Sequence, residues 1–375
     1  MTTVNITING QKIQAQPGQT VYEAAAAAGI DIPVLCHHPA LPPEGACRVC
    51  LVEIEKQRSL QPSCTFPVSE GMVVQTESPR AVAARKFALE LILSDHPLDC
   101  MTCEATGDCR LQDLAYQYGV KGTEFAGGRQ HAYDIDDPNP FIQVDRNKCI
   151  LCRRCVRACN YVNGVEAIGI VYRGFGAKIA FGADSTMEDS PCEFCGSCVE
   201  VCPTGALWPK MSLGKGRAAQ LRQVETVCSY CGVGCKLTLH VRGNRIVKVS
   251  GALGAANHGF TCVKGRFGYD YVYHPDRLSA PRVRRYLLEG KPKPHAHAVA
   301  ENGHEPDAGM EWVEIPWEEA LGLVASKWVA VKQAFGGDAF ATLCSARCTN
   351  EENYLAAKLT RQLMETHNVD HCARL

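Results

Sequence analysis

The residues with the clearest chemistry are cysteines that follow one another at short, regular spacing between Cys149 and Pro203. They form the runs C-I-L-C-R-R-C-V-R-A-C and, after an intervening segment, C-E-F-C-G-S-C-V-E-V-C-P. The spacing C-x2-C-x2-C-x3-C is typical of paired [4Fe–4S] clusters, in which the fourth cysteine of each run ligates the cluster of the other run. The sequence therefore predicts two crossed ligand sets within residues 140–210. These are Cys149, Cys152, Cys155 and Cys202, and Cys192, Cys195, Cys198 and Cys159.

Zinc sites and disulfides are the alternatives for these runs. Zinc motifs pair C-x2-C dyads rather than triads, and a structural zinc protein would bind about five zinc ions here. The start of the chain lacks the basic and apolar regions of a secretory signal. Twenty-two cysteines among 375 residues then fit a reduced compartment with metal-bound thiolates, so we expect a cytoplasmic protein.

Charge and hydropathy exclude two kinds of partner. The net charge is −1, with Lys and Arg scattered among Asp and Glu, so we expect no nucleic acid partner. No apolar run approaches the ~20 residues of a membrane span, so we expect no transmembrane segment.

The elements before these runs must position two further groups of ligands. Val4, Ile6 and Ile8 alternate with polar residues up to Asn9-Gly10, which predicts a hairpin with a tight turn. A capping box then begins a helix over 21–28. Residues 1–78 are therefore expected to form a β-grasp, ferredoxin-like domain.

This first domain contains four cysteines with the spacing C-x10-C-x2-C-x13-C. They are Cys36, Cys47, Cys50 and Cys64. Four thiolates in a small hairpin-and-helix domain suit a [2Fe–2S] cluster. The small residues Gly45 and Ala46 let backbone amides approach the sulfurs, which helps to set the potential.

Residues 79–120 predict a cluster with one histidine ligand. Ser78-Pro79 begins a helix whose apolar face includes Val82, Phe87 and Leu91. The segment H-P-L-D-C-M-T-C-E-A-T-G-D-C follows it and supplies His96, Cys100, Cys103 and Cys109. A lone histidine is more often structural, but one placed before three unpaired cysteines indicates a [4Fe–4S] cluster held by one imidazole and three thiolates. Imidazole in place of thiolate raises the potential, as in Rieske centres.

A fifth group lies in residues 222–280, where strands on either side of Gly243-Asn244 predict a small β-rich domain. Its ligands are Cys228, Cys231, Cys235 and Cys262, for which zinc remains an alternative to [4Fe–4S]. Nineteen cysteines and one histidine then make twenty ligands for one [2Fe–2S] and four [4Fe–4S] clusters. The remaining Cys344, Cys348 and Cys372 are expected to be free thiols.

Residues 311–375 predict the beginning of an α/β domain. A helix over 317–335 is followed by a strand over 340–343, a helix from the Thr349 cap to His367, and a strand that starts at 368–370. The segment before it, with His295 and His297, is interpreted as a solvated loop. The whole chain is therefore expected to be an α+β multidomain protein.

The order of sites through Cys202 resembles the N-terminal half of complex I's largest hydrophilic subunit and of the iron-only hydrogenases. The segment from V-C-S-Y-C-G-V-G-C to F-T-C-V-K-G-R-F resembles the first domain of molybdopterin oxidoreductases. The end of the chain, C-T-N-E-E-N-Y-L-A-A-K-L through N-V-D-H-C-A-R-L, resembles formate dehydrogenase catalytic subunits of the cytoplasmic, iron–sulfur-extended type. Complex I subunits carry only one of the two ferredoxin-type clusters, which argues against that assignment.

This resemblance implies formate/CO2 interconversion at molybdenum or tungsten held by two molybdopterin guanine dinucleotides. Lys264 matches a lysine between the neighbouring cluster and the nearer pterin. The implied redox partner is a flavin- and NAD-binding diaphorase-type subunit, a ferredoxin or a hydrogenase subunit. The competing function is a non-catalytic electron-transfer subunit of an NADH dehydrogenase or hydrogenase complex.

The resemblance also implies that no catalytic residue lies within this chain. In the family, the segment matching V-D-H-C-A-R-L is followed at once by the metal-ligating selenocysteine or cysteine, and Leu375 is the last residue here. A UGA selenocysteine codon after Leu375 is therefore expected. The 375 residues alone are expected to bind clusters and to lack formate dehydrogenase activity.

Overall fold

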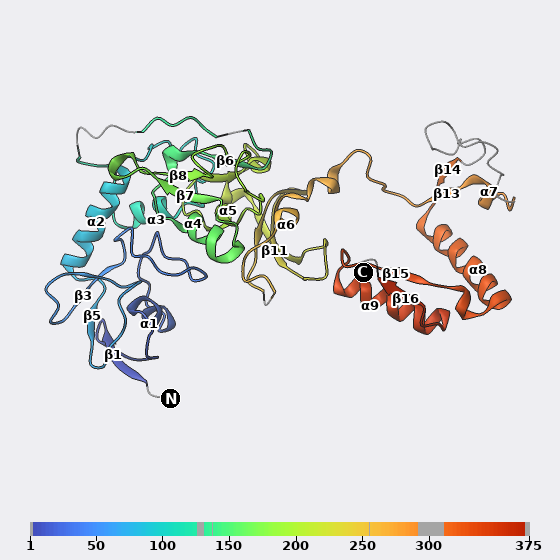
Figure 1. Cartoon of the computed structure of the whole chain (residues 1–375), viewed down its shortest axis with the longest axis horizontal. Coiled ribbons are helices and arrows are strands. Elements are labelled where there is room, and N and C mark those ends of the chain that lie inside the picture. The colour runs from blue at the N-terminus through green and yellow to red at the C-terminus, as the bar shows by residue number, and fades with distance from the viewer. Residues whose placement is uncertain (1–2, 126–130, 137, 255, 292–310, 372–375) are drawn as a thin grey trace. The chain divides into compact units, whose positions relative to one another are not determined.

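The computed structural model describes residues 3–125, 131–136, 138–254, 256–291 and 311–371 (Figure 1). The chain forms two compact units, Met1–Cys228 with Cys235–Gly268, and Ser229–Gly234 with Tyr269–Leu375. The predicted loop with His295 and His297 lies outside the described residues, as do Cys372 and Leu375. Within the described ranges, no helix combines the length and the hydropathy needed to cross a membrane.

A five-stranded sheet begins the first unit, in the order β2–β1–β5–β3–β4. Its strands are β1 (Val4–Ile8), β2 (Gln11–Ala15), β3 (Leu51–Ile54), β4 (Gln61–Pro62) and β5 (Val73–Gln75). The predicted hairpin is confirmed, because β1 pairs antiparallel with β2 and both turn residues, Asn9 and Gly10, have positive φ. Helix α1 (Val21–Ala27) begins at the predicted capping box and packs its buried face on this sheet (Figure 1).

Helices α2 (Pro79–Leu93) and α3 (Arg110–Gln117) form the next layer and share a core with the cysteine loop between them. The expected N-cap at Ser78 is present. The predicted apolar face is wrong, however, since Phe87 and Leu91 are 54% and 47% exposed. The buried residues of α2 are instead Ala81, Arg85, Leu89 and Leu93.

The double-cysteine region is built from two short antiparallel pairs and two short helices. They are β6 (Ile142–Val144) with β9 (Leu207–Pro209), β7 (Ile168–Val171) with β8 (Lys178–Phe181), α4 (Arg154–Arg157) and α5 (Ser197–Val201). A turn of π-helix, Ala158–Asn163, continues α4. Cysteines of both runs belong to the apolar core of this region.

The first unit ends with an antiparallel sheet of β10 (Arg222–Val227), β11 (Lys236–Arg242) and β12 (Arg245–Gly251), followed by α6 (Val263–Phe267). The predicted turn at Gly243-Asn244 connects β11 to β12. The predicted domain 222–280 contributes to both units, because Ser229–Gly234 and the residues after Gly268 belong to the second.

The second unit contains β13 (Arg282–Arg284), α7 (Arg285–Leu288), β14 (Trp312–Glu314), α8 (Trp317–Phe335), β15 (Thr342–Cys344), α9 (Asn350–Leu359) and β16 (Val369–His371). β15 and β16 are parallel and α9 connects them, as predicted for an α/β domain. α9 is shorter than predicted, because a π-helical turn, Thr360–Met364, replaces its C-terminal end.

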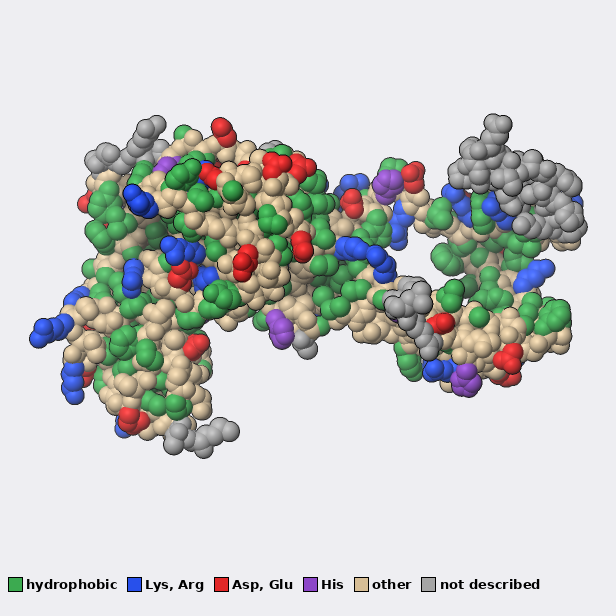
Figure 2. Space-filling view, in the orientation of Figure 1, with side chains coloured by type: hydrophobic (Ala, Val, Ile, Leu, Met, Phe, Trp, Pro, Cys, Tyr) green, Lys and Arg blue, Asp and Glu red, His purple; other side chains and the backbone are tan. Residues whose placement is uncertain are grey.

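The helices of the second unit expose much of their apolar surface. α8 has no buried residue, and its Leu321 and Phe335 are 62% and 76% exposed. Figure 2 shows hydrophobic side chains at the surface of this unit. Helix propensity and the capping box at Thr349 therefore define these helices more than core packing does.

Candidate metal centres

The four cysteines of the first domain converge in its interior. The Sγ atoms of Cys50 and Cys64 lie 3.3 Å apart, and the backbone amide of Cys47 donates to Cys36 Sγ at 3.5 Å. The thiols of Cys47 and Cys64 and the amides of Cys47 and Ala46 lower the pKa of Cys36 to about 2. The amide approach expected beside Gly45 and Ala46 is therefore present. Four gathered sulfurs with backbone donors fit the negative charge of a cluster.

His96 lies on a cavity of about 500 Å³ together with Cys100 and Cys109. Its Nδ1 is 2.9 Å from the carbonyl oxygen of Pro97, which can only accept, so Nδ1 carries the proton. Burial lowers the pKa of His96, so the ring is neutral and its Nε2 presents a lone pair. Burial is the main cause that raises the pKa of Cys109 to about 11, and the nearby thiols of Cys103 and Cys100 add to this effect. The donor set fits a histidine-ligated cluster.

The two cysteine runs have the same local conformation. Leu151 and Phe194, at matching positions between the first two cysteines, have φ of 51° and 53°. Each of their amides donates at 3.4 Å to the first sulfur of its own run, Cys149 and Cys192 respectively. The two cysteine runs therefore repeat the same backbone conformation, in which a backbone amide donates a hydrogen bond to the first cysteine sulfur.

The structure brings the fourth cysteine of each run beside the other run. Burial and then Cys202 raise the pKa of Cys152 to about 12, and Cys202 acts in the same sense on Cys149. On the other side, the side-chain amide of Asn163, just after the first run, donates to Cys195 Sγ at 2.7 Å. Cys159 acts electrostatically on both Cys192 and Cys198. This is the grouping predicted from the spacing.

The fifth group is divided between the two units. Cys228, Cys235 and Cys262 lie in the first unit, where the Cys228 amide donates to the Cys235 carbonyl at 2.8 Å, whereas Cys231 belongs to the second. Gly265 of α6 lies close to this group, because a Cβ on it would be in van der Waals contact with Cys228 Sγ at 3.6 Å. Lys264, the predicted pterin neighbour, lies on the same helix.

Among the described residues, no three His, Cys, Asp or Glu side chains are grouped closely enough to hold one metal ion. Iron–sulfur clusters are held by thiolates around several iron atoms. Cys344 and Cys348, expected to be free, are partly buried thiols of the second unit.

Sequence patterns do not reveal the buried arginines that join neighbouring cysteine loops. Arg157 of α4 donates to the carbonyls of Cys36 and Pro42 and, at 3.4 Å, to that of Cys152. Arg217, which is partly buried, donates to the carbonyl of Cys103. The sequence signal for Arg157 is only the density of arginines in C-R-R-C-V-R-A-C, because the Cys36 carbonyl belongs to a residue more than 100 positions away.

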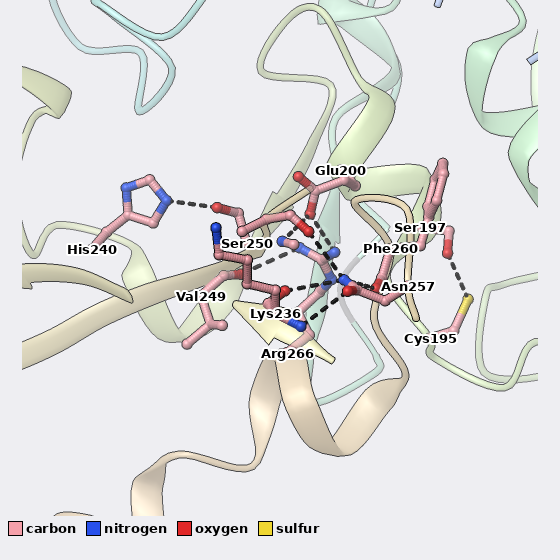
Figure 3. A network of polar contacts seen from close by, with 12 residues as sticks. Cys195, Ser197, Glu200, Lys236, His240, Val249, Ser250, Asn257, Phe260 and Arg266 are labelled. Atoms are coloured by element: carbon pink, nitrogen blue, oxygen red, sulfur yellow. Dashed lines mark hydrogen bonds and ion pairs between the residues drawn. The ribbon is translucent and has the colours of Figure 1, made fainter. Parts of the chain in front are cut away.

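A third such arginine, Arg266 of α6, lies beside the second cysteine run (Figure 3). It pairs with Glu200 of α5 and donates to the Val249 carbonyl of β12 at 3.3 Å. Glu200 also accepts from the Gly251 amide at 3.0 Å. The three-stranded sheet is thereby fixed to the double-cysteine region.

We expect His96→Cys to keep its cluster assembled and to lower the reduction potential of that cluster, because thiolate adds a negative charge. A redox titration followed by electron paramagnetic resonance measures the potential. His240→Cys is the matched control, since His240 is 8% exposed against 9% for His96 and its Nε2 contacts Ser250 Oγ at 2.8 Å. Unchanged titration of every cluster in His96→Cys would mean that His96 is not a ligand.

Family models match five consecutive stretches of the chain. They are a 2Fe-2S iron–sulfur cluster binding domain (1–79), the NADH-ubiquinone oxidoreductase-G iron–sulfur binding region (85–124), the NADH-quinone oxidoreductase subunit 3 ferredoxin-like domain (139–208), the molybdopterin oxidoreductase Fe4S4 domain (221–274) and molybdopterin oxidoreductase (277–375). All twenty predicted ligands fall within the first four matches.

Curated relatives align with nearly the whole chain. The NADPH-Fe(3+) oxidoreductase subunit alpha of Geobacter sulfurreducens is 37% identical over 99% of the chain and 40% of its own length. An NADH-quinone oxidoreductase subunit of Rhizobium meliloti is 36% identical with the same coverage. A putative formate dehydrogenase of Staphylococcus aureus is 29% identical over 98% of the chain and 39% of its own length. The chain thus spans about 40% of the length of these relatives.

Among solved structures, a chain of an NAD+-reducing [NiFe]-hydrogenase in the H2-reduced state is similar, with a TM-score of 0.54 and 35% identity. The match covers 57% of this chain and 90% of that one. The alignment with the Rhizobium relative runs through both cysteine runs, since it covers 99% of the chain.

Proposed function

We propose that the chain, which matches models of iron–sulfur domains and of molybdopterin oxidoreductase, relays single electrons through one [2Fe–2S] and four [4Fe–4S] clusters. The proposal is supported by the core that cysteines of both runs share, and by the hydrogen bond from the side-chain amide of Asn163, just after the first run, to Cys195 Sγ of the second. Such clusters, when bound, take up and release one electron at a time.

The protein's own residues keep the neighbouring cysteine groups close together. Arg157 joins the carbonyls of Cys36 and Cys152, which belong to the first and third groups. A Cβ on Gly205 would lie 3.1 Å from Cys103 Sγ, so the loop after Cys202 is in close contact with the loop that carries Cys103. The buried thiols, among them Cys36, Cys152 and Cys198, are shielded from water. Backbone amides donate to the sulfurs of Cys149 and Cys192.

The substrate that we propose for the complete enzyme is formate, which is interconverted with CO2 at molybdenum or tungsten held by two pterins. The likeness of the C-terminal segment to formate dehydrogenases and the Staphylococcus relative support this choice. Lys264 on α6, close in sequence to Cys262, is proposed to lie between the fifth cluster and a pterin. Electrons would leave through the N-terminal clusters to a flavin- and NAD-binding subunit, a ferredoxin or a hydrogenase subunit.

A second function is favoured by the names of the other relatives. The Geobacter, Rhizobium and hydrogenase proteins are named for NADPH, NADH or NAD+ chemistry. In this alternative the chain belongs to an electron-transfer subunit that has no formate chemistry of its own.

One anaerobic purification of the intact gene product separates the two functions. Metal analysis and optical spectra are recorded before and after addition of formate or of NAD(P)H with the partner subunit. Molybdenum or tungsten together with bleaching of the clusters by formate supports formate dehydrogenase. Iron alone, with no bleaching by formate, supports the relay, and zinc without visible absorbance contradicts both.

A further inference from the structure

Arg266 has one hydrogen-bond donor that the described part of the chain does not use. The residue is 2% exposed, and its two terminal nitrogens bind Glu200 and the Val249 carbonyl (Figure 3). Its Nε is buried and has no hydrogen-bond partner among the described residues. Buried donors are usually paired. The Nε atoms of Arg85 and Arg154 also lack a partner among the described residues, so the Nε of Arg266 points to a cluster only because of where it lies.

The unused donor lies against the second cysteine run. A Cβ built on Gly196 would come within 2.2 Å of Arg266 Cδ and 2.5 Å of Nε. Gly196 also has φ of +76°, so glycine is required there both by the backbone and by the approach of the arginine. The side chain of Arg266 therefore occupies the turn between Cys195 and Ser197.

The charge of Arg266 acts on the same group. Its Cδ and Nε approach Gly196, the residue that directly follows Cys195. Glu200 is the counter-charge of Arg266, and its carboxylate also accepts a hydrogen bond from the Gly251 amide of β12. A positive, desolvated group thus stands beside thiols that must become anionic to ligate iron.

We propose that Arg266 sets the reduction potential of the cluster on Cys159, Cys192, Cys195 and Cys198, by donating its Nε–H to that cluster and by placing positive charge beside it. The inference rests on the proposed function, which assigns a cluster to these thiols. Reduction adds one electron from the reductant, and therefore one negative charge, to the cluster. The cation and the N–H stabilise the reduced form more than the oxidised form, so Arg266 raises the potential.

The test is a redox titration of the full chain, loaded with iron and sulfide, followed by electron paramagnetic resonance. The relevant signal is the one that Cys195→Ser removes. Arg266→Met is expected to lower the equilibrium constant for reduction of this cluster about tenfold, which is about 59 mV for one electron. Glu200→Gln keeps an acceptor for the Gly251 amide but removes the counter-charge, so it is expected to raise the constant.

A purely structural role of Arg266 would not shift the reduction potential in opposite directions in Arg266→Met and Glu200→Gln. Arg266→Lys keeps the charge without the Nε donor and is expected to fall between the parent and Arg266→Met. Arg85→Met is the matched control, because Arg85 is also fully buried. Its partners are a glutamate, a tyrosine and the carbonyls of a leucine and a threonine, and none of them is a cysteine. It is expected to leave this signal unchanged.

Absence of a shift in Glu200→Gln, or shifts of the same sign in Glu200→Gln and Arg266→Met, would overturn the role of Arg266 while leaving the relay intact. If Arg266→Met does not fold, Glu200→Gln and Arg266→Lys decide the question by the same criteria. If the parent chain has no signal that Cys195→Ser removes, the assignment of a cluster to these thiols fails, and the role of Arg266 fails with it.

Discussion

Cys159→Ala is expected to abolish the cluster of the second cysteine run and to leave the cluster of its own run assembled. In the structure, Cys159 is close enough to Cys192 and Cys198 to help raise the pKa of both thiols. Cys202 has the same effect on Cys149 and Cys152. A [4Fe–4S] cluster that loses one of four thiolates loses the ligand that closes its site. Iron and sulfide analysis should show a loss of about four of roughly eighteen iron atoms.

Electron paramagnetic resonance then identifies which cluster is missing, by comparison with Cys192→Ala and Cys149→Ala. Cys159→Ala should match the spectrum of Cys192→Ala. Cys344→Ala is the control, since Cys344 is a partly buried thiol of the second unit that belongs to no predicted set. A spectrum of Cys159→Ala that matches that of Cys149→Ala would show that the ligands are not crossed.

Arg157→Met is expected to lower the free energy of unfolding of the first unit by about 3–5 kcal/mol, because it takes a donor away from several buried acceptors. The carbonyls of Cys36, Pro42 and Cys152 and the carboxylate of Glu44 each lose one partner. Urea unfolding of the loaded chain, followed by cluster absorbance and by far-UV circular dichroism, measures the change.

Arg153→Met is the matched control for this stability prediction. Arg153 is nearby on the chain and also pairs with Glu44, at 2.7 Å, but its side chain is 49% exposed. An exposed ion pair contributes only about 0–1 kcal/mol, so the control should change the urea midpoint little. Equal losses in the two variants would mean that the bridge from Arg157 to the cysteine carbonyls does not stabilise the unit.

The sequence predicted those features that depend on neighbouring residues. The bounds of α8, the capping boxes of α1 and α9 and the turn at Asn9-Gly10 are local, and the structure confirms them. The crossed grouping was predictable because cysteine spacing determines which thiols can reach one another. The ligand roles themselves stay predictions.

Features that depend on distant partners were not predictable from the sequence. The predicted apolar face of α2 was wrong because Arg85 is completely buried, which hydrophobic periodicity does not anticipate. The two terminal nitrogens of its guanidinium donate to Glu77, to the Tyr118 hydroxyl and to the carbonyls of Leu51 and Thr76. The contacts of Arg157 and Arg266 were not predictable for the same reason, because their partners become neighbours only after folding.

The exchange of the fourth cysteine between the two runs has a consequence for the biogenesis of the protein. On the ribosome, the first run emerges well before Cys202, so its three early thiols wait for a ligand that has not yet been translated. Cys159 must in turn remain reduced and unoccupied until the second run arrives. Because metal binding here closes chain loops, cluster delivery and folding of this region become a single step. We therefore expect the clusters of these two runs to be completed only after Cys202 has been translated.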